Sequence, residues 1–140
     1  MNVNSLLPVN AYAMENDVVL NGEPVAVSDD NVARISGLIT LYSITLSKSG
    51  STLRLVANTD CVSGVTKCGL KELVIQKRNS STSKWENYIV FNDLYENSSS
   101  HTYADSYTVP SSYQYRATCK HYAKKSLLNT QTIDNTSNIV

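Results

Sequence analysis

Several features that mark other classes of protein are scarce or missing in this chain of 140 residues. No stretch approaches the roughly twenty consecutive apolar residues of a membrane-spanning helix, so we expect no membrane insertion. Only 17 % of the residues are charged. The basic ones are scattered, apart from the pairs Lys77-Arg78 and Lys124-Lys125, which argues against nucleic-acid binding. Helical periodicity of useful length and internal repeats are also missing, which leaves a β-rich chain of one domain's length.

The sequence also lacks the motifs of common catalytic and cofactor sites. It has no glycine-rich phosphate loop, no G-x-S-x-G, and no H-x-x-H or C-x-x-C spacing for a metal. Cys119 and His121 lie two apart on one strand, but strand neighbours on one face are roughly 6.5–7 Å apart, and no third residue is placed to orient the histidine. We therefore expect no cofactor, no metal and no catalytic residue.

The residues that are abundant favour an extracellular β-protein. Nine tyrosines stand against one phenylalanine and one tryptophan, and tyrosine suits a half-buried sheet surface. The net charge is zero, but residues 1–33 hold five acidic and no basic residues, whereas residues 34–140 hold twelve basic and seven acidic ones. The body of the chain is therefore basic, with an acidic segment before it.

The clearest pattern runs from Tyr113 to His121, where odd positions are aromatic, small or sulfur-bearing and even positions are polar. Such alternation predicts a strand with one buried and one wet face. The strand follows a turn at Pro110-Ser111-Ser112 and carries an inward cysteine, Cys119. A strand entered through a tyrosine and holding an inward cysteine indicates the sixth strand of an immunoglobulin-like or fibronectin-like sandwich.

Short β-rich runs with turn signals between them make up the rest of residues 35–140. They cover residues 38–46, 53–61, 70–77, 84–91, 103–109 and 130–140. We therefore predict an all-β, immunoglobulin- or fibronectin III-like sandwich of about seven antiparallel strands. Residues 124–128 could form a helical turn, too short to change this class.

The first 34 residues have a different character. Residues 1–13 read as the remnant of a secretory signal peptide, with Ala11 and Ala13 as the small residues of a cleavage site before Met14. The alternative is a disordered tail with a chance A-x-A, because a basic n-region is missing. Residues 14–34 predict a flexible arm or, at most, an edge strand. We expect a secreted, extracellular protein that is released rather than tethered.

The body of the chain resembles an uncharacterised family of small secreted proteins from Gram-positive, largely gut-dwelling bacteria. The resemblance covers roughly residues 35–140 and is carried by Tyr42 to Gly50, Cys61, Gly69 to Gln76, Trp85, Tyr113 to Lys124 and Asn135 to Asn138. It implies a single sandwich domain behind a signal peptide, and no activity or ligand comes with it. Cys68 departs from the family pattern.

Three cysteines allow three different single bridges. Cys61 is in phase with inward residues of its strand and so is Cys119, and the resemblance also favours a Cys61–Cys119 disulfide with Cys68 as a free, buried thiol. Cys61–Cys68, Cys68–Cys119 or no bridge remain alternatives. The chain-entropy model gives roughly 4 kcal/mol for the long bridge and roughly 2.4 kcal/mol for Cys61–Cys68, so loop length does not choose between them.

The tyrosines give the functional hint. Tyr122 falls on the face opposite Tyr113 and Tyr115, and Tyr88 is predicted opposite Trp85 and Phe91. Aromatic residues on a wet face can stack on sugars or anchor a protein, although cross-strand packing alone also explains them. We therefore expect a secreted, non-enzymatic and monomeric binding module for an unidentified extracellular protein or glycan. A small hydrolase with a site on the strand-end loops, or a purely structural surface protein, are the alternatives.

Overall fold

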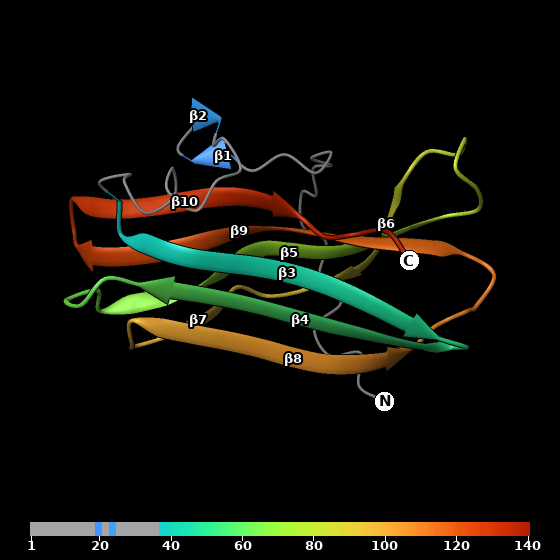
Figure 1. Ribbon diagram of the computed structural model, residues 1–140, viewed down its shortest axis with the longest axis horizontal. Coiled ribbons are helices and arrows are strands. Elements are labelled where there is room, and N and C mark those ends of the chain that lie inside the picture. Colours follow the sequence, from blue (N-terminus) through green and yellow to red (C-terminus); the bar gives the residue numbers. More distant parts are fainter. Residues whose placement is uncertain (1–18, 21–22, 25–36) are drawn as a thin grey trace.

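Two antiparallel sheets face each other in the computed structural model, which describes residues 19–20, 23–24 and 37–140 (Figure 1). One sheet has the order β3-β4-β8, with bounds Ile39–Ser49, Thr52–Cys61 and Ser100–Thr108. The other has the order β2-β1-β10-β9-β5-β6, and β7 also pairs with β5. Its bounds are β1 Val19–Leu20, β2 Glu23–Pro24, β5 Lys67–Arg78, β6 Glu86–Val90, β7 Leu94–Glu96, β9 Gln114–Ser126 and β10 Asn129–Thr136.

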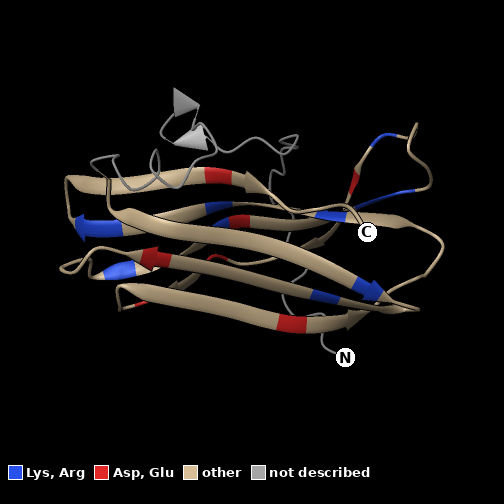
Figure 2. Ribbon diagram, in the orientation of Figure 1, with Lys and Arg blue, Asp and Glu red and all other residues tan. Residues whose placement is uncertain are grey.

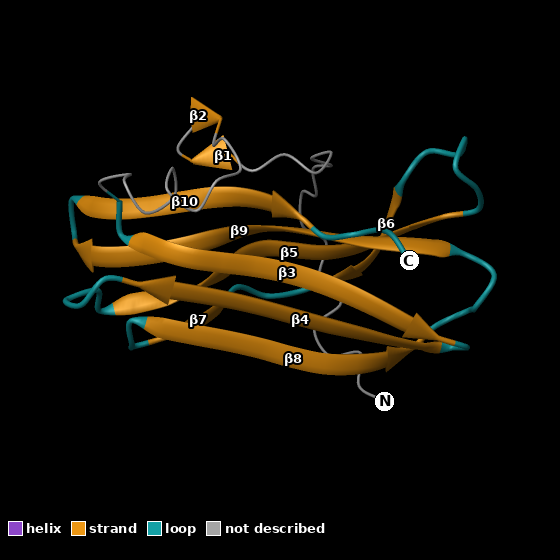
Figure 3. Cartoon of the chain, viewed as in Figure 1, coloured by secondary structure: helices purple, strands orange, loops and turns teal. Residues whose placement is uncertain are grey.

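The predicted fold class is confirmed. The described residues form strands and loops but no helix (Figure 3). When β6 and β7 are counted as one interrupted edge strand, β3 to β10 make seven strands, of which the first, second and fifth form one sheet. The third, fourth, sixth and seventh form the other, which is an immunoglobulin-like order with the fourth strand beside the third. The strand with the clearest sequence pattern, β9, is the sixth.

The interruption between β6 and β7 has a local cause in β5. Glu72 has a φ of 53°, a conformation that few residues other than glycine adopt. The pairing of β5 with β9 shifts between Lys71 and Val74, which marks a β-bulge. The carboxylate of Asp93 accepts a hydrogen bond from the Glu72 amide at 3.1 Å. The edge strand therefore breaks beside the bulge, and β7 is too short for sequence alternation to show it.

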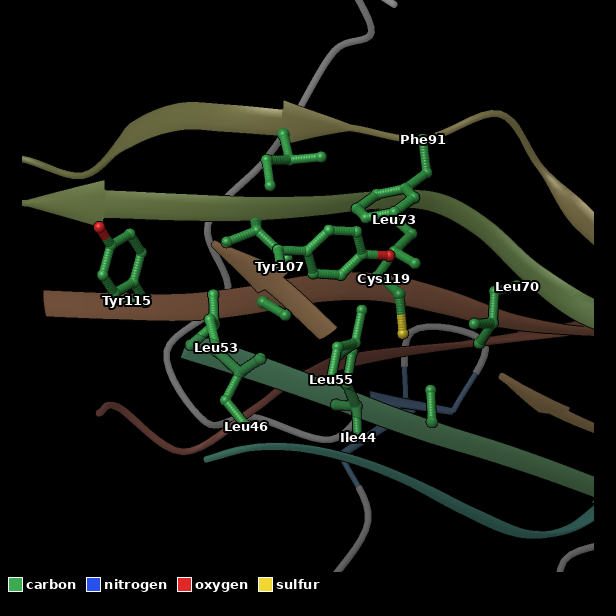
Figure 4. Close-up of a cluster of buried hydrophobic side chains, with 14 of the residues drawn as sticks. Ile44, Leu46, Leu53, Leu55, Leu70, Leu73, Phe91, Tyr107, Tyr115 and Cys119 are labelled. Carbon is green, nitrogen blue, oxygen red and sulfur yellow. The ribbon is translucent and has the colours of Figure 1, made fainter. Parts of the chain in front are cut away.

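The core lies between the sheets and follows the alternation of the sequence. Leu53, Leu55 and Ala57 on β4 point inward, as do Tyr115 and Cys119 on β9 (Figure 4). A fully buried Leu contributes about 1.5–3 kcal/mol relative to an exposed one, so this cluster supplies much of the driving force for folding.

Tyr115 ties the entrance of β9 to the preceding loop. Its hydroxyl donates a hydrogen bond to the carbonyl of Pro110, which is the tyrosine corner of immunoglobulin-like domains. Lys48, at the end of β3, donates to the carbonyls of Ser111 at 3.0 Å and Tyr113 at 2.9 Å. The β8–β9 connection is thereby fixed against the β3–β4 hairpin.

Two amide side chains join β3 to the opposite sheet. The Gln131 carbonyl oxygen accepts from the amides of Leu38 at 2.6 Å and Ile39 at 2.8 Å. At the other end, Asn138 accepts from the Leu46 amide at 2.9 Å and donates to the Leu46 carbonyl at 2.8 Å. Asn138 thus pairs with β3 as a neighbouring strand would.

The N-terminal segment and the turn before β10 differ in part from what the sequence predicted. β1 pairs with β10, with Leu20 opposite Ile133, and β2 pairs with β1 as the edge of the sheet, so part of residues 14–34 forms two short strands. The proposed leader, residues 1–13, lies outside the described residues. Leu127 and Leu128 form a tight turn between β9 and β10. The helical turn predicted for residues 124–128 is therefore wrong, because Lys124 to Ser126 continue β9.

We predict that Asn138→Ala lowers the free energy of unfolding by about 1–3 kcal/mol, because it leaves the amide and carbonyl of Leu46 without their partner. Urea unfolding at pH 7 measures this change. Asn97→Ala is the matched control, because Asn97 is an exposed loop residue, and it should change stability by less than about 0.5 kcal/mol. Equal effects of both substitutions would contradict the role given to Asn138.

Candidate functional site

Tyr122 lies on the outer face of the large sheet, as predicted, and a second tyrosine lies beside it. Gly69 on β5 pairs with Tyr122 of β9 on one side and Tyr95 of β7 on the other. The two rings meet across the glycine with centroids 5.3 Å apart. A Cβ atom at Gly69 would lie 1.8 Å from the Leu94 carbonyl oxygen, so only glycine permits this close approach of β7.

Two lysines cover this pair of rings. The ammonium of Lys67 lies 4.4 Å from the Tyr95 ring centroid, and that of Lys71 lies 5.1 Å from the Tyr122 centroid. Such cation-π contacts contribute about 0.5–1 kcal/mol at exposed sites. We call Tyr95, Tyr122, Lys67 and Lys71 the tyrosine-lysine face.

Positively charged residues border the tyrosine-lysine face. Lys120 and Lys124 occupy the same face of β9, and basic segments gather where β9 ends and β5 begins (Figure 2). Lys120 forms an ion pair with Asp134 at 2.8 Å, whereas Lys67 and Lys71 form no ion pair with any residue of the described part of the chain.

The Tyr95 hydroxyl donates to the Asp93 carboxylate at 3.1 Å. Burial and then Asp93 raise the pKa of Tyr95, so this phenol stays neutral at physiological pH.

Tyr88, the other predicted binding residue, lies elsewhere. The pairing of β5 with β6 shifts between Ile75 and Gln76, and Tyr88 is the extra residue of this bulge. Its ring packs toward the core side, 6.1 Å from the Tyr115 ring, with the Lys77 ammonium 4.8 Å from its centroid. The expected placement opposite Phe91 is wrong, because the bulge reverses the alternation. Tyr88 and Tyr122 do not share a surface.

The sequence reasoning missed Tyr95 as a site residue and also the packing of Trp85. The Trp85 ring contacts two guanidinium groups, with Arg78 at 4.2 Å and Arg116 at 4.4 Å from its centroid. Arg116 is 1 % exposed and donates to Gln76 at 2.8 Å. This cluster holds the loop between β5 and β6 in place. In the sequence, the only indication of it was that Arg116 occupies one of the even-numbered positions of β9.

The buried imidazole of His121 is the centre of a polar network. Its Nε2 atom accepts a hydrogen bond from the Asn135 amide at 3.1 Å, and its Nδ1 atom lies 2.8 Å from the Thr59 hydroxyl. Since Nε2 is an acceptor, Nδ1 carries the proton and donates to Thr59. The Thr59 hydroxyl in turn donates to the Gly69 carbonyl at 3.4 Å. The network joins β4 of one sheet to β5, β9 and β10 of the other.

Cys119 and His121 are adjacent, but their environment opposes nucleophilic chemistry. The Cys119 sulfur lies 3.6 Å from Nε2, the same atom that Asn135 approaches, and both residues are fully buried. Burial lowers the pKa of His121 to about 3 and raises the pKa of Cys119. A reactive thiolate needs the opposite shifts, so the pair is assigned a structural role.

The predicted Cys61–Cys119 disulfide is not formed in the structure, where all three cysteines are free thiols. Because Thr59 meets His121 across the core and β4 and β9 run in the same direction (Figure 1), Cys61 lies beyond the level of Cys119. Cys61 instead packs against the separate buried cluster that contains Cys68. Cys61 and Cys119 both occupy the predicted inward positions of their strands. However, the two sheets are offset along the strand direction, so Cys61 lies near Cys68 rather than Cys119.

In residues 19–20, 23–24 and 37–140 no group of three or more His, Cys, Asp or Glu side chains is placed to hold a metal ion. The same residues include no helix long and apolar enough to cross a membrane. Comparisons with protein-family models, curated proteins and solved structures find no match to the chain.

We predict that His121 makes the protein less stable in acid. The unfolded chain takes up this proton near pH 6.5 and the folded chain near pH 3, so stability from the neutral imidazole is fully present above about pH 6.5 and declines as the pH falls toward 3. Between pH 7 and pH 5 the loss should be about 2 kcal/mol. Urea unfolding at both values measures it.

The corresponding control is His121→Gln, which removes the titrating group. It should reduce the difference in the free energy of unfolding between pH 7 and pH 5. If the variant does not fold, the imidazole of the unmodified protein can be titrated by NMR. A His121 signal that titrates near pH 6.5 in the folded protein would contradict the assignment.

Proposed function

We propose that this chain is an exported, non-enzymatic binding module and that its ligand is an acidic glycan. The observation that carries the proposal is the tyrosine-lysine face on the outer side of β5, β7 and β9. Its two rings are half-buried beneath the lysine ammonium groups, and the surface that they leave exposed offers apolar contact to a sugar ring. Its two ammonium groups, which form no ion pair within the described residues, suit carboxylate or sulfate groups.

The arrangement of the lysines supports an anionic rather than a neutral ligand. Each ammonium has three N–H donors, and the rings beneath Lys67 and Lys71 use only one side of each group. The remaining donors are free to bind anionic oxygens. Lys120, by contrast, is neutralised by Asp134. The lysine positions are also partly fixed by the rings, which lowers the entropic cost of ordering them on binding.

Export is proposed on two grounds. The first thirteen residues read as a leader fragment, and the body resembles small secreted proteins of Gram-positive gut bacteria. A glycan ligand fits that location, since acidic polysaccharides occur on cell surfaces and in the surrounding matrix. A hydrolase acting through the strand-end loops, or a purely structural protein, remain the alternatives from other classes of function.

We predict binding of a hyaluronan oligosaccharide, which carries one carboxylate per disaccharide, in preference to a neutral chitin oligosaccharide of equal length. Isothermal titration calorimetry at low and high salt measures both. The double variant Lys67→Gln/Lys71→Gln should weaken binding about tenfold, equivalent to about 1.4 kcal/mol, and remove most of the salt dependence. Tyr122→Leu should weaken binding about threefold to tenfold, because it removes the ring that positions the Lys71 ammonium and its apolar contact to the sugar.

Two controls separate this face from the rest of the molecule. Arg54→Gln removes an exposed positive charge from β4, in the other sheet, and should leave binding unchanged. Tyr88→Leu removes a tyrosine from the core side of β6 and should also leave it unchanged. Binding that survives the double lysine variant would refute the proposal, as would equal affinity for the neutral oligosaccharide. Cleavage of the probe would favour the hydrolase.

A further inference from the structure

Cys61 and Cys68 stand at the two ends of the crossover between the sheets. Cys61 is the last residue of β4, and Cys68 is the second residue of β5. The Cys68 sulfur donates to the carbonyl of Thr59, two residues before Cys61, at 3.3 Å, and Cys61 packs against the buried cluster that contains Cys68. The two side chains therefore share one cluster in the reduced protein.

The backbone holds both residues firmly. The Cys61 amide donates to the Ser99 carbonyl at 2.8 Å, and the Val62 amide donates to the Leu38 carbonyl at 2.8 Å. Cys68 lies within the sheet, opposite Ala123 of β9 and Glu96 of β7. Gly64, with a φ of 94°, makes the turn between them. The two cysteines therefore flank one short turn whose strand ends are held by hydrogen bonds.

We propose that Cys61 and Cys68 form a disulfide that links the two sheets at this crossover, with Cys61 as the attacking thiol and Cys68 as the resolving thiol. This site is independent of the proposed glycan binding. Cys61 is partly exposed, whereas Cys68 is fully buried, so an oxidant reaches Cys61 first. The pKa values agree with this order, because the hydrogen bond with Cys68 lowers the pKa of Cys61, while the same contact and burial raise the pKa of Cys68.

The oxidant is a small-molecule disulfide such as oxidised glutathione. Cys61 loses its proton to water, and its thiolate attacks one glutathione sulfur and releases the other glutathione as a thiolate. Cys68 then attacks the Cys61 sulfur of this mixed disulfide, its proton passes to the departing second glutathione, and the protein disulfide forms. Two protein thiols are oxidised and one glutathione disulfide is reduced to two glutathiones.

Cys119 is excluded from the reaction by its position. It is buried in the main core cluster with its sulfur against His121, whereas Cys61 packs on the separate cluster that contains Cys68. After oxidation, Cys119 is thus the remaining free buried thiol, whereas in the reduced protein Cys68 is also a free buried thiol, as the sequence predicted.

Peptide mapping of the oxidised full-length protein tests the proposal without any substitution. The folded protein is treated with oxidised glutathione, unfolded, alkylated and cut with trypsin. Cleavage after Arg54, Lys67, Lys71, Arg116 and Lys120 places the three cysteines in separate peptides, 55–67, 68–71 and 117–120. We expect peptide 55–67 joined to 68–71, with the Cys119 peptide alkylated.

The oxidised protein should also melt about 5–10 °C higher than the reduced one, and the rise should disappear on reduction. Cys119→Ala should still form the bridge, whereas Cys61→Ser should not. A link between peptides 55–67 and 117–120 would overturn the proposal, as would three alkylated cysteines after oxidation. Failure of glycan binding would leave this result unaffected, so the two proposals are tested separately.

Discussion

The buried hydrogen bond between Thr59 and His121 fixes how the two sheets face each other. The bond joins β4 to β9 across the core, at 2.8 Å, and continues through Asn135 to β10 and through Gly69 to β5. Apolar side chains can slide past one another at small cost, but a buried polar network cannot, because each shifted partner leaves a donor or acceptor unpaired. This bond therefore also determines where Cys61 lies along the strand direction relative to Cys68 and Cys119.

The outer face depends on departures from regular strand geometry. Gly69 lets β7 approach β5, and this approach places Tyr95 next to Tyr122. The bulge at Glu72 ends the long edge strand, so that β7 rather than a continuous β6 lies beside Gly69. The bulge at Tyr88 turns that ring toward the core side. Each irregularity involves one residue, yet together they determine which aromatic side chains share a surface.

These features explain which parts of the structure could be predicted from the sequence and which could not. Alternation of apolar and polar residues depends only on local strand geometry, so the strands, the inward phase of Cys119 and the outward phase of Tyr122 could be predicted. The turn at Pro110 and the tyrosine at the start of the next strand could also be read from the sequence, but the hydrogen bond from Tyr115 to Pro110 is seen only in the structure. The partner of Cys61 could not, because alternation does not encode the offset between facing sheets. The position of Tyr88 could not either, because a bulge reverses the phase without a sequence signal.

Consecutive residues of β9 have separate roles, because they lie on opposite faces of the strand. His121 is buried and neutral and connects the sheets, whereas Tyr122 lies outside with Tyr95 and the lysines. A period of two allows this separation, because each residue of a strand meets a different environment from the next. The link between the faces is Gly69, whose carbonyl accepts from Thr59 while its missing side chain lets the β7 backbone approach. The backbone that completes the buried network thus also positions the proposed ligand surface.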